Sequence, residues 1–107
     1  MKRDGREVVE GIQYQGVDEQ IIYSLTTTNW GSNPTATVSV KAYDVTDDYT
    51  DVSGTVLSGS ASVSDDVITL PKVKSLTLGH LYRIEVQFTI TGVGTPFEAY
   101  IQIEGTR

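Results

Sequence analysis

A turn followed by a strand, near the C-terminal end, constrains the fold of this chain more than any other feature. In Leu76–Val86, a Leu-x-Leu-Gly turn leads into a strand whose first inward residue is Tyr82, and apolar residues follow at every second position. This is the pattern of a tyrosine corner, in which the tyrosine hydroxyl bonds back to the backbone of the preceding turn. The segment therefore predicts a Greek-key β-structure, with Leu76, Gly79 and Tyr82 as structural residues.

Period-two patterning predicts strands along most of the chain. Val and Thr make up a quarter of the residues and favour pleated, half-buried strands. The expected strands are Val8–Tyr14, Asp18–Leu25, Thr35–Tyr43, a short one around Tyr49, Ser60–Val63, Val67–Leu70, and the segments after residues 81 and 96. No segment shows a convincing helical pattern. We therefore expect an all-β sandwich of seven to eight antiparallel strands, each sheet with one face in water.

Length and charge narrow the classes of function. The 107 residues suit one domain, residues 8–107, preceded by a loose basic arm over residues 1–7. Without the first six residues, the formal charge changes from −6 to −8 (five basic and thirteen acidic residues remain), which disfavours nucleic acid as a partner. There is no cysteine, no apolar run of the ~20 residues that a membrane span needs, and no apolar signal core at the N-terminus.

The segment Ser75–Val86 resembles the corner between the fifth and sixth strands of fibronectin type III and related immunoglobulin-like domains. Leu76 matches the leading apolar residue, Gly79 the turn glycine and Tyr82 the corner tyrosine, while Leu78 stands where those domains often carry proline. The resemblance implies an immunoglobulin-like Greek-key sandwich. It implies no activity, because this fold carries many functions.

A longer stretch, covering most of residues 16–104, is similar to small uncharacterised proteins encoded among phage and prophage structural genes. The similarity lies in Gly16–Glu19, Leu25–Pro34 and Asp66–Leu70. It implies a role in or near the virion, as a head, neck or tail accessory module. The expected location is accordingly the virion or the host cytoplasm.

Acidic loop residues suggest a possible calcium site. Asp44, Asp47, Asp48 and Asp51 supply the hard oxygens that calcium prefers, but their spacing lacks the glycine and the terminal glutamate of an EF-hand loop. The alternative is a solvated acidic loop that discourages pairing between sheet edges.

No catalytic constellation is evident. The single histidine, His80, falls inside the corner turn, and the nine serines include no Gly-x-Ser-x-Gly elbow. Glu85, Glu98 and Glu104 point outward from the last two strands, where cross-strand ion pairs are a better use for them than glycoside hydrolysis. We therefore expect a non-enzymatic protein.

Three aromatic residues are candidates for binding. Trp30 is a stacking platform for a sugar, an anchor in a protein interface, or an apolar plug at one end of the sandwich. Tyr43 and Tyr100 point outward, where they form one aromatic face if their strands share a sheet. The first functional hypothesis is a structural or accessory module of a phage-like virion that docks other assembly proteins or copies of itself. The alternative is a carbohydrate-binding module that uses these aromatics, with or without calcium.

Overall fold

The computed structural model describes residues 6–26, 39–90 and 96–107, and the side chains from residue 12 onward within these ranges except that of Pro96. These residues form ten strands and one short helix: β1 (Arg6–Gly16), β2 (Ser24–Thr26), β3 (Ser39–Asp44), β4 (Thr50–Asp51), α1 (Ser53–Val56), β5 (Leu57–Ser58), β6 (Ser62–Ser64), β7 (Val67–Thr69), β8 (Lys72–Val73), β9 (Leu81–Thr89) and β10 (Pro96–Thr106). The protein is mostly β-structure, as the patterning predicts.

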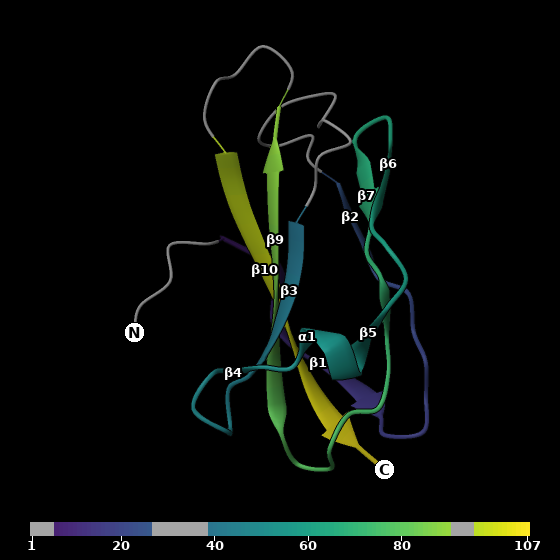
Figure 1. The fold of residues 1–107 in the computed structure, drawn as a ribbon, viewed down its shortest axis with the longest axis vertical. Coiled ribbons are helices and arrows are strands. Elements are labelled where there is room, and N and C mark those ends of the chain that lie inside the picture. Colours follow the sequence, from purple (N-terminus) through teal and green to yellow (C-terminus); the bar gives the residue numbers. More distant parts are fainter. Residues whose placement is uncertain (1–5, 27–38, 91–95) are drawn as a thin grey trace.

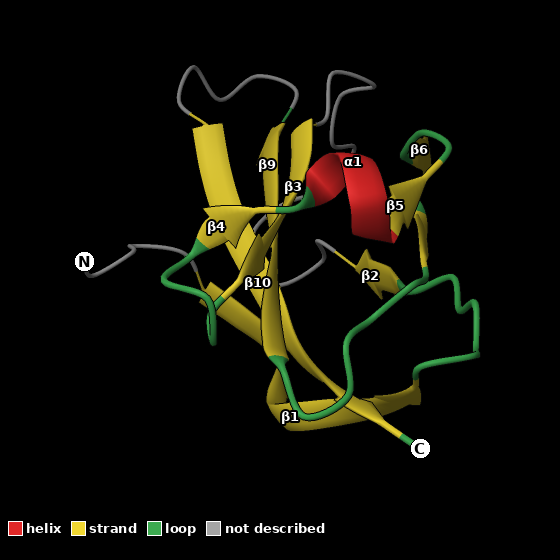
Figure 2. Ribbon diagram, turned by 60° about the horizontal axis from the view of Figure 1, so that its bottom comes forward, coloured by secondary structure: helices red, strands yellow, loops and turns green. Residues whose placement is uncertain are grey.

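The strands lie in two layers (Figure 1). One layer is a five-stranded sheet in the order β1-β10-β9-β3-β4. The other holds the three-stranded sheet β2-β7-β6 and the pair β5-β8. Figure 2 shows the molecule turned about the horizontal axis. In this view α1 lies between β3 and β5, where the chain crosses from one layer to the other.

Apolar residues from both layers form one core. Tyr82, Ile84, Val86 and Phe88 of β9 alternate into it, as the sequence predicts, and all are at most 2% exposed. Their counterparts on β10 and in the second layer are at most 5% exposed: Ala99, Ile101, Ile103, Leu25, Ile68 and Val73. Each fully buried side chain of this size stabilises the fold by about 1.5–3 kcal/mol relative to an exposed one. The long strands β9 and β10 therefore hold the molecule together.

The prediction of seven to eight strands, all antiparallel, is wrong in two respects. There are ten strands among the described residues, because the two-residue strands β5 and β8, which are too short to show a period, add to the eight that patterning predicts. The first strand, β1, pairs with β10 in parallel. It lies at the edge of its sheet and begins at Arg6, inside the segment predicted to be a loose arm.

Two local predictions also need correction. The segment Asp18–Leu25 forms a strand only at its end, in β2, with an isolated bridge between Ile21 and Val73 before it. The helix α1, with four residues, has no counterpart in the sequence prediction. At this length it falls far short of what crossing a bilayer requires, and the described residues hold no longer helix. The two strands predicted at Ser60–Val63 and Val67–Leu70 are present as β6 and β7, which pair as an antiparallel hairpin across Asp65.

The tyrosine corner is confirmed. The hydroxyl oxygen of Tyr82 accepts a hydrogen bond of 2.7 Å from the backbone N–H of Thr77, five residues earlier in the turn. Gly79 adopts a φ of +81°, which disfavours any residue with a Cβ. Leu76 is buried against the core, whereas Leu78 is 49% exposed. The turn also contacts the end of β10, since the N–H of Gly79 donates to the carbonyl of Gly105 over 2.9 Å.

A buried glutamine links the two layers at the end of β1. Gln15 is fully buried, and its amide nitrogen donates to the backbone carbonyls of Glu19 and Val73 at 3.0 and 2.8 Å. Its side-chain oxygen accepts a bond of 2.9 Å from the hydroxyl of Tyr23. Since Val73 lies in β8, this network fastens the edge of the first layer to the second.

Candidate functional site: the outer face of the five-stranded sheet

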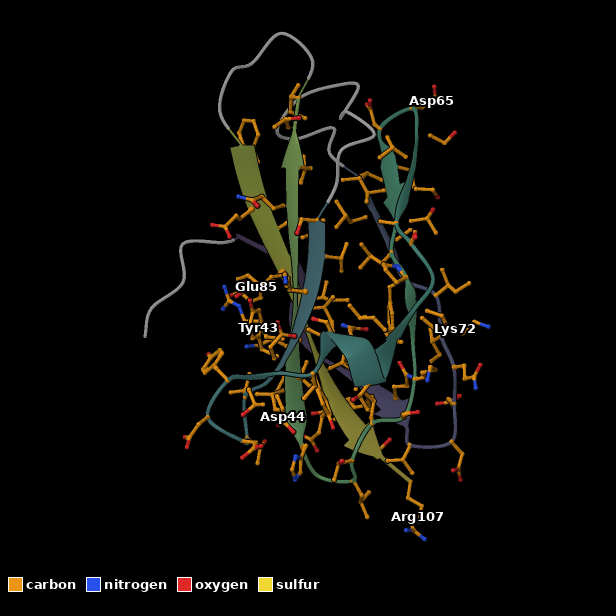
Figure 3. The ribbon with its side chains drawn as sticks, viewed as in Figure 1. Tyr43, Asp44, Asp65, Lys72, Glu85 and Arg107 are labelled. Carbon is orange, nitrogen blue, oxygen red and sulfur yellow. The ribbon has the colours of Figure 1, made fainter. Side chains whose placement is uncertain are left out.

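The side of the five-stranded sheet that faces away from the core carries two of the three candidate aromatic residues, Tyr43 and Tyr100. Strand pairing places the outward residues of β3, β9 and β10 in three rows across the sheet, because paired residues point to the same side. We call this surface the outer face, and its rows are Tyr43-Arg83-Gln102, Lys41-Glu85-Tyr100 and Ser39-Gln87-Glu98. Tyr43 and Glu85 lie on the side of the sheet away from the second layer (Figure 3).

Tyr43 and Tyr100 thus share one sheet, which was the condition for an aromatic face. They flank β9 from its two neighbouring strands and are both half-buried. Trp30, the third aromatic candidate, lies outside the described residues.

Arg83 lies on the middle strand of the outer face and is unusually buried for an outward residue. It is only 6% exposed, its guanidinium lies 3.6 Å from the centre of the Tyr100 ring, and its Nε donates to a carboxylate oxygen of Glu85 over 2.8 Å. The ring face attracts the cation, and the carboxylate fixes its direction. Its Nη2 has no hydrogen-bond partner within the described part of the chain.

A hollow of about 190 Å³ opens beside Arg83 on the same face. Its lining is mostly polar and comes from three strands: Ser39, Lys41, Tyr43, Glu85, Gln87 and Glu98. Lys41 Nζ lies 3.9 Å from a carboxylate oxygen of Asp51 on the neighbouring β4, so its charge is partly offset from outside the hollow. Glu98 is exposed and makes no ion pair with any residue that the structure describes.

The four aspartates of the predicted calcium set are not gathered at one point. Asp44 is buried on the core side of β3, where its carboxylate lies 2.7 Å from Nδ1 of His80. Asp51 pairs with Tyr43 in register and therefore points to the opposite side of the sheet, where it accepts bonds from Ser53. Asp47 and Asp48 are exposed in the turn between them. The residues with known placement contain no group of three acidic or histidine side chains that could hold a metal ion.

The Ser53 contacts have an electrostatic consequence at Asp51. Hydrogen bonds from the Ser53 hydroxyl and backbone N–H lower the pKa of the Asp51 carboxyl, and the ammonium of Lys41 lowers it further. Asp51 therefore keeps its negative charge under mildly acidic conditions. This charge lies on the outer face, next to Tyr43.

The His80–Asp44 pair is a feature that sequence reasoning missed. The two residues are 36 positions apart, and no motif joins them. A carboxylate that orients an imidazole is two thirds of a nucleophilic triad. However, among the described residues no serine or threonine hydroxyl bonds to His80. The pair instead ties the β3–β4 turn to the corner, where Leu81 N–H also donates to Thr46 Oγ1 over 2.9 Å.

The outward glutamates of the last two strands are used differently from each other. Glu85 pairs with Arg83 on its own strand, two residues away. Glu98 and Glu104 make no ion pair within the described residues, and both lie along β10. The signal for the Arg83–Glu85 pair is present in the sequence, as opposite charges at i and i+2 of one strand, but this spacing alone does not indicate burial.

Comparisons of the chain with protein-family models, with curated proteins and with solved structures found no match.

Proposed function

We propose that this protein is a non-enzymatic docking module that binds another protein through the outer face of its five-stranded sheet. The observation that carries the proposal is the cluster of Tyr43, Arg83 and Tyr100 on that face, with its guanidinium already stacked and bonded in place. Tyrosine and arginine are enriched at the centres of protein interfaces. A side chain that is already immobilised loses little further conformational entropy when a partner covers it.

The fold that we propose for this module is the immunoglobulin-like Greek-key sandwich. The strand order in each layer supports it. In one layer, the order β10-β9-β3 matches the last, sixth and third strands of such domains. In the other layer, the order β2-β7-β6 matches their second, fifth and fourth strands. The bonded corner at Tyr82 supports it as well. The short pair β5-β8 and the parallel β1 are additions to that scheme.

We further propose that the protein acts in a phage-like virion, on the basis of the resemblance of most of residues 16–104 to proteins of phage structural-gene regions. On this basis the partner is another virion protein or a second copy in the assembly, and the protein is found in the virion or the host cytoplasm. Sandwich faces and edges suit symmetric assemblies, which reuse one contact many times. The basic residues Lys2, Arg3 and Arg6 near the start of the sequence are complementary in charge to acidic neighbours.

A photo-crosslinking amino acid tests the docking face directly. One variant carries it at Gln87, exposed on the outer face, and a matched variant carries it at Ser62, exposed on β6 in the other layer. Both are produced in the cell that naturally makes the protein, and crosslinked products are identified by mass spectrometry. We expect one discrete protein adduct from position 87 and none from position 62. Equal adducts from both positions, or none from either, would contradict the proposal.

The second candidate is carbohydrate binding, favoured by the polar hollow with Tyr43 in its lining. It is weaker for Tyr100, because the Arg83 guanidinium already covers one side of that ring. Titration of a glycan panel, followed by NMR at the Tyr43 amide, tests it with and without millimolar calcium. Silence across the panel leaves protein docking as the better explanation.

A further inference from the structure

We infer that the hollow beside Arg83 receives an arginine side chain from the docked partner. This inference deepens the proposed docking function and rests on it. It names the chemistry of the partner's anchor: a guanidinium on a basic protein segment.

The outer face already contains one guanidinium site of this kind. Arg83 is held by one tyrosine ring, at 3.6 Å, and one carboxylate, at 2.8 Å. The lining of the hollow next to it also includes a tyrosine ring and a carboxylate, those of Tyr43 and Glu98, together with the Gln87 amide and the Ser39 hydroxyl as further acceptors. A planar fork of five N–H donors matches such an acceptor-rich, aromatic-walled hollow better than a compact ammonium does.

Charge supports a cationic occupant. Two ion pairs on the outer face involve both of its basic residues, Arg83 with Glu85 and Lys41 with Asp51. The formal charges left over are the carboxylates of Glu98 and Glu104, both on β10. The whole chain carries −6, so a second copy approaching face to face would bring like charges together. A basic segment of another protein, lying along β10, is the complementary partner.

Lys41 is the one residue of the lining that opposes a cation. Its ammonium lies 3.9 Å from Asp51, and its side chain is 55% exposed, so it can turn toward β4 and solvent. With Lys41 offset by Asp51, and Arg83 by Glu85, Glu98 supplies the net charge of the hollow.

The test uses the full chain and a small probe, N-acetyl-arginine amide, followed by two-dimensional ¹⁵N–¹H NMR. N-acetyl-citrulline amide, which has the same shape but no charge, is the matched ligand. We expect saturable shifts of the amides of Lys41, Gln87 and Glu98 with the arginine probe at millimolar concentrations, and none with citrulline. Equal shifts with the two probes, or shifts spread over the whole acidic surface, would overturn the inference.

Two glutamine variants test the residue assignment. Glu98→Gln should weaken binding of the arginine probe at least threefold, whereas Glu104→Gln, on the same strand and face but away from the hollow, should leave it unchanged. Equal weakening by both would mean that only general charge attracts the probe, and the assigned hollow would be wrong. The crosslinking result at position 87 is independent of this outcome, because a partner without an arginine anchor would still form the adduct.

Discussion

At the scale of single residues, the stability of the fold depends on a few side chains that make specific hydrogen bonds in its interior. The Tyr82 hydroxyl holds the corner, the Gln15 amide joins the layers, and the Asp44 carboxylate fixes His80. Burial makes such bonds important, because an unpaired polar group inside a protein costs about 1–3 kcal/mol. Each of them should therefore be visible in the free energy of unfolding.

Tyr82→Phe tests the corner. The variant keeps the ring in the core but removes the acceptor for the Thr77 N–H. We expect a loss on the order of 1 kcal/mol in the free energy of unfolding, measured by urea denaturation followed by circular dichroism. Tyr14→Phe is the matched control, because Tyr14 is 66% exposed, and it should change stability by less than about 0.5 kcal/mol. Equal stability of the two variants would show that the corner bond does not stabilise the fold.

The Tyr23 hydroxyl should make the protein sensitive to alkali. Burial, and then the nearby carboxylate of Glu19, raise the pKa of Tyr23 above its ordinary value of 10.0. A raised pKa in the folded state means that the unfolded chain loses this proton first. The stabilising contribution is therefore complete below about pH 10 and falls as the pH rises through the folded pKa.

Denaturation curves between pH 8 and 11 measure this effect. Stability should decline above pH 10 in the natural protein, because the phenolate can no longer donate to Gln15. Tyr23→Phe should start from a lower stability at pH 8 and decline less steeply. Parallel curves for the two proteins would exclude Tyr23 as the source of the alkaline loss.

At the scale of elements, close contact between the corner turn and the end of β10 limits which residues can replace Gly105. A Cβ added at Gly105 would lie 2.5 Å from the backbone carbonyl oxygen of Thr77. Both segments are fixed in place, since Gly105 N–H donates to the His80 carbonyl and accepts from Gly79 at its own carbonyl. Neither backbone can move away without breaking a bond.

Gly105→Ala should therefore destabilise the protein by roughly 1–3 kcal/mol, the usual cost of overpacking. Gly54→Ala is the matched control. Gly54 lies in α1, and an added Cβ there meets nothing within 4 Å, so the change should be neutral or stabilise by up to about 1 kcal/mol. Thermal unfolding of the two variants measures both effects. A neutral Gly105→Ala would mean that the β10 end and the corner can separate at no cost.

How well each element could be predicted from the sequence depends on its length. Strands β9 and β10 span nine and eleven residues, long enough for alternation to identify both faces. Strands β5 and β8 have two residues each and exist because they pair with each other, which no local pattern reveals. The parallel pairing of β1 with β10 is a contact between the two ends of the chain, and alternation does not encode strand direction.

The candidate site was predictable only in part, for a related reason. Alternation placed Tyr43 and Tyr100 outward, and the structure adds that β9 lies between their strands. The burial of Arg83 depends on neighbours contributed by other strands, so its own strand pattern marks it as exposed. The separation of Asp44 from Asp51 follows from the register of β3 with β4, which turns their side chains to opposite sides of the sheet. Register of this kind is set by tertiary packing.

At the scale of the whole molecule, the order in which contacts form follows from how far apart they are in the chain. The hairpin of β9 and β10 joins Ile84 to Ile101 through a short connection, whereas β2 reaches β7 only by joining Leu25 to Ile68. The pairing of β1 with β10 joins Arg6 to Ala99 and so closes a loop that contains almost the whole chain. Closing a longer loop costs more conformational entropy, and this cost comes before the new contacts can stabilise the chain. We therefore infer that the hairpin forms first and the two distant pairings later.

Two conservative core variants test this order. Ile84→Val and Leu25→Val each remove buried apolar volume and should cost about 1 kcal/mol at equilibrium, since both residues are at most 5% exposed. Stopped-flow chevrons should show that Ile84→Val mainly slows folding, because β9 is already packed in the transition state, while Leu25→Val mainly speeds unfolding. The natural protein should refold in milliseconds to seconds, as proteins dominated by distant strand pairings do. The reverse assignment of the two variants would mean that the second layer nucleates the fold, and that the five-stranded sheet carrying the outer face assembles on it.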